Sequence, residues 1–257
     1  ANTSGASPAV SLNQNVVIQN QLFLSEGELG GGGTLTLGNG TPNTITINVG
    51  VAAGTMAGGR IQSGKTVSYN MANMNHLGNY YALTPAAGYT TGKELPDLSS
   101  AIPNGGLITI YNPHDDGVVL GNNATVYSLT NSFNSTLVLN GKTLRLGGNF
   151  TNSATTTSNT MGLDSRAAGS KLHFAGSQMQ TIALGNQTFT TASPTITAPD
   201  IEVSNSFFNN YYTSGATIYE SGVTRTIKNH TVNSGSYFQA FYYSSSSLAV
   251  TGDISNN

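Results

Sequence analysis

Three short stretches decide the fold: Leu144–Asn152 reads LRLGGNFTN, Lys171–Ile182 reads KLHFAGSQMQTI, and Pro199–Asn205 reads PDIEVSN. Each contains two apolar residues separated by one other residue, which is the alternation of a strand with one buried face. The pairs are Leu144/Leu146, Leu172/Phe174 and Ile201/Val203, followed by a weaker Thr226-Ile227 and by Leu248/Val250. They recur at intervals of roughly 23 to 29 residues, a spacing typical of stacked repeats.

The repeat predicts an all-β fold, namely a parallel β-solenoid whose successive units stack and bury their apolar sides collectively. A second pattern favours an antiparallel β-sandwich instead. Asn140-Gly141 stands between two alternating runs, which is the strongest short hairpin signal, and in such a hairpin Leu137 would face Leu144. The solenoid is our first prediction because the repeat extends over about a hundred residues. The sandwich remains the alternative.

Outside the repeat, the chain divides into an N-terminal part and a middle part. Residues 1–50 carry alternating runs that predict strands at 16–18, 22–24, 35–37 and 45–47. Residues 51–105 lose this alternation and contain three prolines, so we expect an irregular insertion or cap with one short helix over 66–77. Residues 106–257 carry the repeat and are expected to form one continuous domain with 1–50.

Charged residues are scarce, since nine basic and eleven acidic side chains make up 8 % of the 257 residues and leave a net charge of −2. Such a surface offers no field that would gather nucleic acid or an anionic membrane, and we expect neither partner. No apolar run reaches the roughly 20 residues that cross a bilayer, so we expect no membrane insertion. Asn, Ser, Thr and 31 glycines supply the polar character and suit strands and turns.

The start of the chain points to export. It begins with Ala1 and continues with the small polar residues 2–7, as expected after removal of a signal peptide. The chain has no cysteine, which excludes a disulfide scaffold, a thiolate metal site and a cysteine nucleophile. We therefore expect an extracellular or cell-surface location on a bacterium.

The phrases over residues 137–205 resemble the repeats of large cell-surface, adhesin-like proteins of Bacteroidetes-type bacteria. In those repeats a Gly-Asn-apolar-Thr-Asn strand precedes a strand with Gln-Thr-Ile, as Gly148–Asn152 precedes Gln180–Ile182 here. The resemblance implies an exported solenoidal protein that takes part in adhesion, motility or an extracellular fibre. It implies no catalytic residue.

An acidic pair supports an alternative function. Asp115 and Asp116 are adjacent within Asn112–Gly117, and two carboxylates serve as acid and base in β-helix hydrolases or hold Ca²⁺ in lyases. The pectin-hydrolase group also needs a second acid motif, a Gly-His-Gly and an Arg-x-Lys, and Arg225–Lys228 has one residue too many for the last. We therefore expect a turn here and no enzyme, with a polysaccharide-active enzyme as the alternative.

No other set of residues predicts chemistry. His76, His114, His173 and His230 have no metal-ligand spacing, and no Gly-x-Ser-x-Gly elbow occurs with an acid and a histidine in order. We expect no metal, no cofactor and no nucleophile. Because His173 alternates with apolar neighbours, we expect it to point to solvent from a strand.

Tyrosine and phenylalanine gather in the last fifth of the chain. Consecutive aromatic residues cannot all face the core of a strand, so some are exposed or covered by a partner. We expect a head-to-tail contact with another copy of the chain, which propagates into a filament, and we keep surface carbohydrate as the alternative ligand. The candidate partner-binding residues are Tyr211, Tyr212, Phe241, Tyr242 and Tyr243.

Overall fold

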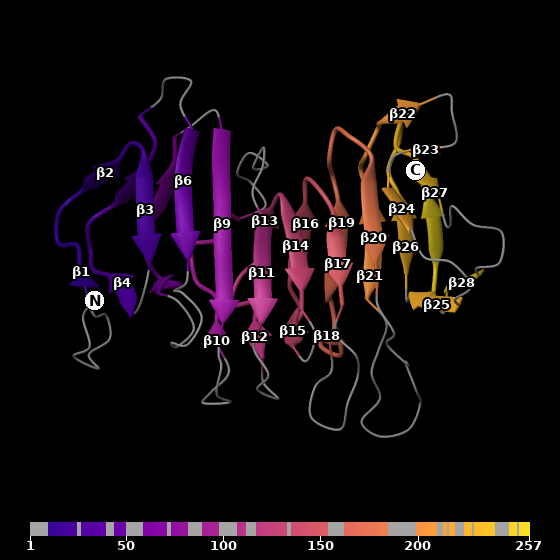
Figure 1. Cartoon of the computed structure of the whole chain (residues 1–257), viewed down its shortest axis with the longest axis horizontal. Coiled ribbons are helices and arrows are strands. Elements are labelled where there is room, and N and C mark those ends of the chain that lie inside the picture. The colour runs from indigo at the N-terminus through magenta and orange to yellow at the C-terminus, as the bar shows by residue number, and fades with distance from the viewer. Residues whose placement is uncertain are drawn as a thin grey trace.

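The computed structural model describes residues 10–24, 27–39, 44–49, 59–70, 73–81, 89–97, 107–111, 117–132, 135–153, 162–184, 199–209, 213–214, 216–218, 224–227, 229–239, 247–250 and 252–257. All regular secondary structure in these ranges is β-strand, so the all-β prediction is confirmed. Within them there is no helix with the length and apolarity that crossing a membrane requires. Strands β1 to β29 follow one another along the length of the molecule (Figure 1).

The largest sheet has nine strands and extends from one end of the molecule to the other (Figure 1). Its strands, in spatial order, are β27 (Phe238–Gln239), β24 (Ala216–Ile218), β20 (Gln180–Ala183), β17 (Phe150–Asn152), β14 (Ser128–Asn131), β11 (Leu107–Tyr111), β9 (Asn73–Tyr81), β6 (Thr44–Val49) and β3 (Gln21–Leu24).

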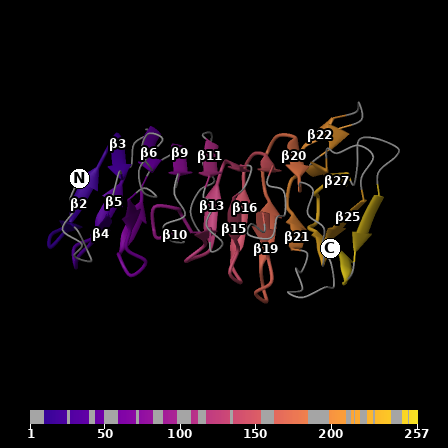
Figure 2. The same ribbon diagram turned by 60° about the horizontal axis from the view of Figure 1, so that its bottom comes forward.

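A second sheet has six strands. In spatial order they are β13 (Ala124–Val126), β16 (Thr143–Leu146), β19 (Lys171–Phe174), β21 (Asp200–Val203), β26 (His230–Val232) and β29 (Ile254–Asn256). Its members β13, β16, β19 and β21 lie side by side near the middle of Figure 2.

The remaining strands form smaller sheets. A four-stranded sheet contains β10 (Tyr89–Thr90), β12 (Val118–Val119), β15 (Thr136–Val138) and β18 (Gly162–Asp164). Two three-stranded sheets contain β1 (Val10–Ser11), β4 (Glu28–Gly30) and β7 (Arg60–Ile61), and β2 (Val16–Ile18), β5 (Leu35–Leu37) and β8 (Val67–Tyr69). Two strand pairs are β22 (Phe208–Asn209) with β23 (Thr213–Ser214), and β25 (Thr224–Ile227) with β28 (Ser247–Val250).

Strand pairing is parallel throughout the described residues except between β22 and β23. The chain visits three sheets in turn: β1, β2 and β3 belong to different sheets, and β4, β5 and β6 pair with them in the same order. β7, β8 and β9 then pair with β4, β5 and β6. The antiparallel sandwich is therefore wrong for the described strands.

The Asn140-Gly141 dipeptide turns the chain without making a hairpin. Both residues have positive φ, 52° and 69°, and Lys142 donates its backbone N–H to the carbonyl of Leu139 at 2.9 Å. The flanking strands nevertheless belong to different sheets, because β15 pairs with β12 and β18 whereas β16 pairs with β13 and β19. The turn chemistry is as predicted, but the pairing of Leu137 with Leu144 is wrong.

The middle of the chain is not an irregular insertion where it is described. β7, β8, β9 and β10 lie within 51–105 and pair in parallel with strands before or after them. The predicted helix over 66–77 is wrong, since β8 and β9 occupy it. The neighbouring strands β5, β6 and β11 supply the backbone hydrogen bonds that a helix would have made within itself. Local composition therefore did not decide the conformation of this segment.

The core is built from columns of apolar residues that stack from strand to strand. Leu144, Leu172 and Ile201 are aligned in β16, β19 and β21, and each is almost fully buried. The register continues into His230 of β26 and Ile254 of β29. The predicted fourth and fifth repeats, Thr226-Ile227 and Leu248/Val250, instead form β25 and β28 in another sheet.

Buried amide side chains replace apolar ones at the bends between strands. Gln180 accepts the Gly176 N–H at 2.9 Å and donates to the carbonyls of Leu146 and Gly148. Asn205 in turn donates to the Gln180 oxygen at 2.9 Å. Because buried backbone groups must find partners, these amides satisfy the chain where it leaves the sheet ladders.

Asparagine and aspartate side chains also make a recurring hydrogen bond at the starts of strands. A side-chain oxygen of one residue accepts the backbone N–H of the residue aligned with it in the next strand, at 2.8–3.3 Å. This contact, the Asx ladder, joins Asn15 to Thr34, Asn123 to Thr143, Asn149 to Thr181, Asp200 to Asn229, and Asn229 to Asp253. It extends the backbone ladder by one rung and accounts for part of the asparagine content.

Candidate functional site

The residues singled out for function in the sequence lie outside the described residues. This holds for the acidic pair Asp115 and Asp116, for Tyr211 and Tyr212, and for Phe241, Tyr242 and Tyr243. Of the histidines, His173 and His230 are fully described. The structure therefore directs attention to two other features, the outer face of the six-stranded sheet and the open strand edges at the two ends.

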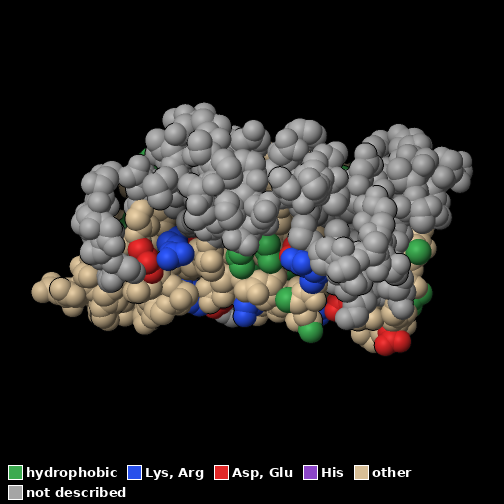
Figure 3. Space-filling model, turned by 90° about the horizontal axis from the view of Figure 1, so that it is seen from below, with side chains coloured by type: hydrophobic (Ala, Val, Ile, Leu, Met, Phe, Trp, Pro, Cys, Tyr) green, Lys and Arg blue, Asp and Glu red, His purple; other side chains and the backbone are tan. Residues whose placement is uncertain are grey.

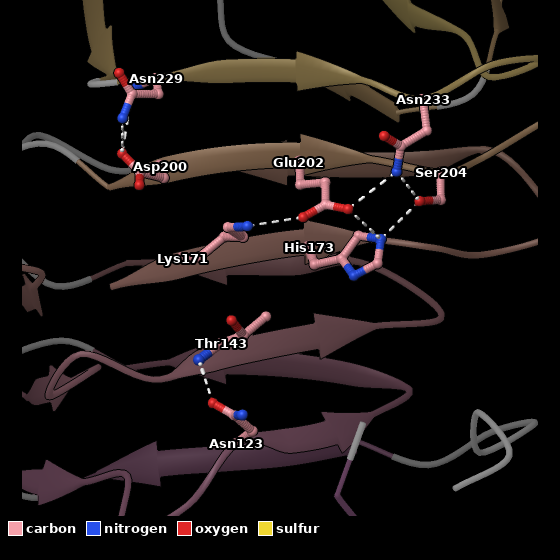
Figure 4. Close-up of polar contacts among 9 residues, drawn as sticks. All are labelled: Asn123, Thr143, Lys171, His173, Asp200, Glu202, Ser204, Asn229 and Asn233. Atoms are coloured by element: carbon pink, nitrogen blue, oxygen red, sulfur yellow. Dashed lines mark hydrogen bonds and ion pairs between the residues drawn. The ribbon is translucent and has the colours of Figure 1, made fainter. Parts of the chain in front are cut away.

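Polar and charged side chains gather on the outer face of the six-stranded sheet (Figure 4). They lie on β19, on β21 and the residue after it, and on the two residues that flank β26. In β19 and β21 burial alternates, so Lys171, His173 and Glu202 point outward while the residues between them are buried. His173 lies on the outward side of its strand as predicted, but its side chain is only 17 % exposed and does not project freely into solvent. On the face shown in Figure 3, the described basic and acidic side chains lie in a few small groups. Among the described residues, Arg60 pairs with Glu28 at 3.3 Å and Arg166 pairs with Asp164 at 2.7 Å.

Glu202 is the centre of this cluster. Its carboxylate accepts a hydrogen bond from Lys171 Nζ at 2.9 Å and another from Asn233 Nδ2 at 3.0 Å (Figure 4). Partial burial acts to raise the pKa of Glu202, but the bonds from Lys171 and Asn233 outweigh it and lower the pKa overall. Glu202 is therefore held as a carboxylate, which links three successive strands.

His173 and Ser204 lie beside this carboxylate. His173 Nε2 is hydrogen-bonded to Ser204 Oγ at 2.7 Å and lies 3.7 Å from Glu202 Oε1. Burial lowers the pKa of His173, Glu202 acts against that shift, and Arg145 and Lys171 add to it. A neutral imidazole is favoured.

The three residue types match a hydrolytic triad, but their geometry differs from one. In a triad the hydroxyl and the acid contact opposite ring nitrogens, so that the acid orients the base. Here both approach Nε2. Ser204 Oγ also accepts a hydrogen bond from Asn233 Nδ2 at 2.7 Å. The arrangement is a polar network that joins neighbouring strands.

Sequence reasoning missed this cluster, although a signal for it was present. Its members occupy the outward positions of the same repeat whose inward positions defined the core: Lys171 and His173 alternate with Leu172 and Phe174. Aligning the repeats by their apolar residues would have placed Lys171 beside Asp200 and His173 beside Glu202.

One buried carboxylate lies away from this face. Glu94 is completely buried and accepts the backbone N–H groups of Gly92 at 2.8 Å and Ile61 at 2.9 Å. Burial raises its pKa to about 7, against the lowering effect of these hydrogen bonds and of Arg60. The carboxyl group fastens the segment after β10 to β7.

The strand edges at the two ends carry exposed apolar side chains. At the N-terminal end Val17 of β2 is 56 % exposed and Phe23 of β3 is 59 % exposed. At the C-terminal end Ile254 of β29 is 70 % exposed, although its column is otherwise buried. Both β2 and β29 have a partner on only one side among the described strands.

The described residues contain no group of three or more His, Asp or Glu side chains placed to hold a metal ion.

A scan against protein-family models, a search of curated proteins and a search of solved structures each found no match.

Proposed function

We propose that this protein is an extracellular structural protein of a bacterial surface, a fibre subunit or adhesin that acts through contacts with its own copies. The observation that carries the proposal is the pair of open edges, β2 and β29. Unpaired edges template pairing with another chain unless charge, proline or a cap blocks them. Neither β2 nor β29 contains a charged residue or a proline.

The fold that we infer for this function is a parallel β-solenoid. It is supported by parallel registers that return to the same sheets and by apolar columns that run from strand to strand. In such a fold each layer contacts only its neighbours, so an uncovered end layer exposes half of its stacking surface. A second copy offers a matching surface.

Composition adds to the proposal. Stacked like charges repel one another, whereas stacked Asn, Thr and Ser side chains bond, so a weakly charged chain suits a stack. The C-terminal aromatics, Tyr211, Tyr212, Phe241, Tyr242 and Tyr243, stay our candidates for partner contact, with surface carbohydrate as the alternative ligand.

Concentration-dependent assembly tests the proposal. We expect light scattering and electron microscopy of the purified chain to show linear particles that lengthen with concentration. Deleting residues 1–15, or changing Tyr242 and Tyr243 to Ser, should leave a folded monomer. A wild-type chain that stays monomeric at high concentration would contradict the proposal.

The competing enzymatic function is tested on the same protein. We expect no release of reducing sugar or unsaturated product from a panel of acidic polysaccharides. Product release that disappears in Asp116→Ala would overturn the structural function in favour of a polysaccharide-active enzyme.

A further inference from the structure

Ile254 stands at the end of an apolar column that no described strand covers. The aligned residues before it, Leu172, Ile201 and His230, are all buried, whereas Ile254 is 70 % exposed. An isoleucine in a core column loses contact with water only when another strand lies over it. The exposed isoleucine therefore marks a missing neighbour on the outer side of β29.

In the described ranges of the chain, the carboxylate of Asp253 at the same edge lacks the hydrogen bond that its counterparts in the Asx ladder accept. In the Asx ladder Asp200 accepts the Asn229 N–H, and Asn229 accepts the Asp253 N–H at 3.0 Å. The Asp253 carboxylate is the next acceptor in this series, and it contacts no donor among the described residues. The ladder thus points beyond β29 to a backbone N–H one strand further.

The opposite end of the molecule offers the complementary groups on β2. Asn15 begins the ladder there, since its Oδ1 accepts the Thr34 N–H at 2.8 Å, and Val16 donates its N–H to the Thr34 carbonyl at 2.9 Å. Both bonds face β5. The Asn15 N–H has no partner within the described part of the chain.

We propose that β29 of one copy pairs in parallel with β2 of the next, with Asp253 opposite Asn15, Ile254 opposite Val16 and Ser255 opposite Val17. This inference rests on the proposed self-assembly and specifies its joint. The Asp253 carboxylate accepts the Asn15 N–H, as Asn229 accepts that of Asp253. Ile254 then packs on Val16, whose column continues into the buried Leu35.

The register follows from the alternation of side chains along a strand. A shift of one residue would place Ile254, which continues the core column, beside the outward-facing Val17 of the next copy instead of beside Val16. A shift of two would remove Asp253 from the Asn15 N–H. The apolar column and the Asx ladder therefore select the same register.

Engineered thiols test this register without interference, because the chain has no cysteine. Paired residues of adjacent strands lie about 4.8 Å apart, within the Cα distances that disulfides bridge. β2 and the C-terminus lie at opposite ends of the molecule, so a bond between positions 17 and 255 must join two copies (Figure 1).

We expect Val17→Cys/Ser255→Cys to give a ladder of covalent dimers, trimers and longer chains on a non-reducing gel after mild oxidation. The matched control is Phe23→Cys/Ser255→Cys, which places an equally exposed thiol on β3 of the same end. The control should give no ladder beyond dimers. A ladder from the control but not from the 17/255 pair would overturn the register.

Two substitutions of Asp253 test the ladder contact independently. Asp253→Asn keeps an acceptor oxygen and should leave assembly within about twofold of wild type. Asp253→Ala removes the oxygen and should raise the concentration needed for assembly roughly tenfold, with the unchanged melting temperature of dilute protein showing that the monomer is intact. Equal assembly by both variants would overturn the contact.

The outcomes also separate this joint from the proposed function. If wild type forms linear particles but the 17/255 variant forms no covalent ladder, the joint is wrong and self-assembly stands. If wild type forms no particles at any concentration, both are wrong.

Discussion

Gln180 shows how much of the stack depends on a single amide. It contacts the backbone of Leu146, Gly148 and Gly176 and receives a hydrogen bond from Asn205. The motif Gln-Thr-Ile in the sequence thus has a physical role, because an amide both donates and accepts where three segments meet.

Gln180→Ala should lower the free energy of unfolding by about 3 kcal/mol or more, because it leaves several buried polar groups without a partner. The measurement is chemical denaturation followed by far-UV circular dichroism. Gln178→Ala is the control, since the Gln178 residue is exposed and its substitution should change stability by less than about 0.5 kcal/mol. Similar losses in both variants would argue against the buried network.

Glu94 should make stability fall as pH rises. Its pKa is raised from 4.5 to about 7 in the folded chain, so the folded state binds the proton more tightly. Its contribution is complete below about pH 4.5 and is lost as pH rises through about 7, which amounts to about 3 kcal/mol. Chemical denaturation at several pH values gives the free energy of unfolding as a function of pH. The decrease between about pH 4.5 and 7 should disappear in Glu94→Gln. A slope that is identical in the variant would contradict the assignment.

At the Asn140-Gly141 turn, a local signal indicated the wrong strand pairing. Asn140-Gly141 has the positive φ values of a hairpin turn, yet β15 and β16 diverge into different sheets. The dipeptide reverses the chain locally, but the partner of each strand is set by which neighbours bury its apolar side.

Cysteine pairs distinguish the two pairings directly. Thr130→Cys/Thr151→Cys joins aligned outward positions of β14 and β17 and should form an intramolecular disulfide in most molecules. Val138→Cys/Thr143→Cys joins positions that only a hairpin would bring together, and it should remain reduced. Mass spectrometry after mild oxidation reads both. The reverse result would restore the antiparallel arrangement.

For the molecule as a whole, contacts between neighbouring strands predict that stability varies along the stack. The C-terminal part contains a weak point at His230, which is buried and packs on Phe238 with 4.3 Å between ring centroids. Neither of its ring nitrogens has a hydrogen-bond partner among the described residues. Burial lowers the pKa of His230, so its neutral form is the one that folds. Protonation of His230 therefore favours the unfolded chain. The contribution of neutral His230 to the free energy of unfolding is complete above about pH 6.5 and is lost as the pH falls.

Hydrogen exchange at about pH 5 should therefore show β26 and β29 opening while β5 and β16 stay protected. His230→Leu, which restores the apolar column, should protect β26 and β29 and add about 1–3 kcal/mol to stability. His173→Gln removes a histidine from the outer face of the same sheet and should not protect them. Simultaneous opening of all four strands would contradict a stepwise loss.

Local alternation was sufficient to predict strands at 16–18, 22–24, 35–37 and 45–47, and the inward and outward positions of β16, β19 and β21, because a strand's period of two is written within a few residues. The scarcity of helix-forming surface residues likewise excluded a helical fold.

Only the tertiary structure decided which strands pair, that residues 51–105 contribute strands, and that His230 occupies a core column. These depend on partners roughly 20 to 35 residues away, and parallel pairing needs such long connections. It also revealed Glu202, Ser204 and Asn233 as one network. Their contact arises only when separate strands stack in register, since no stretch of chain contains all of them within one turn or strand.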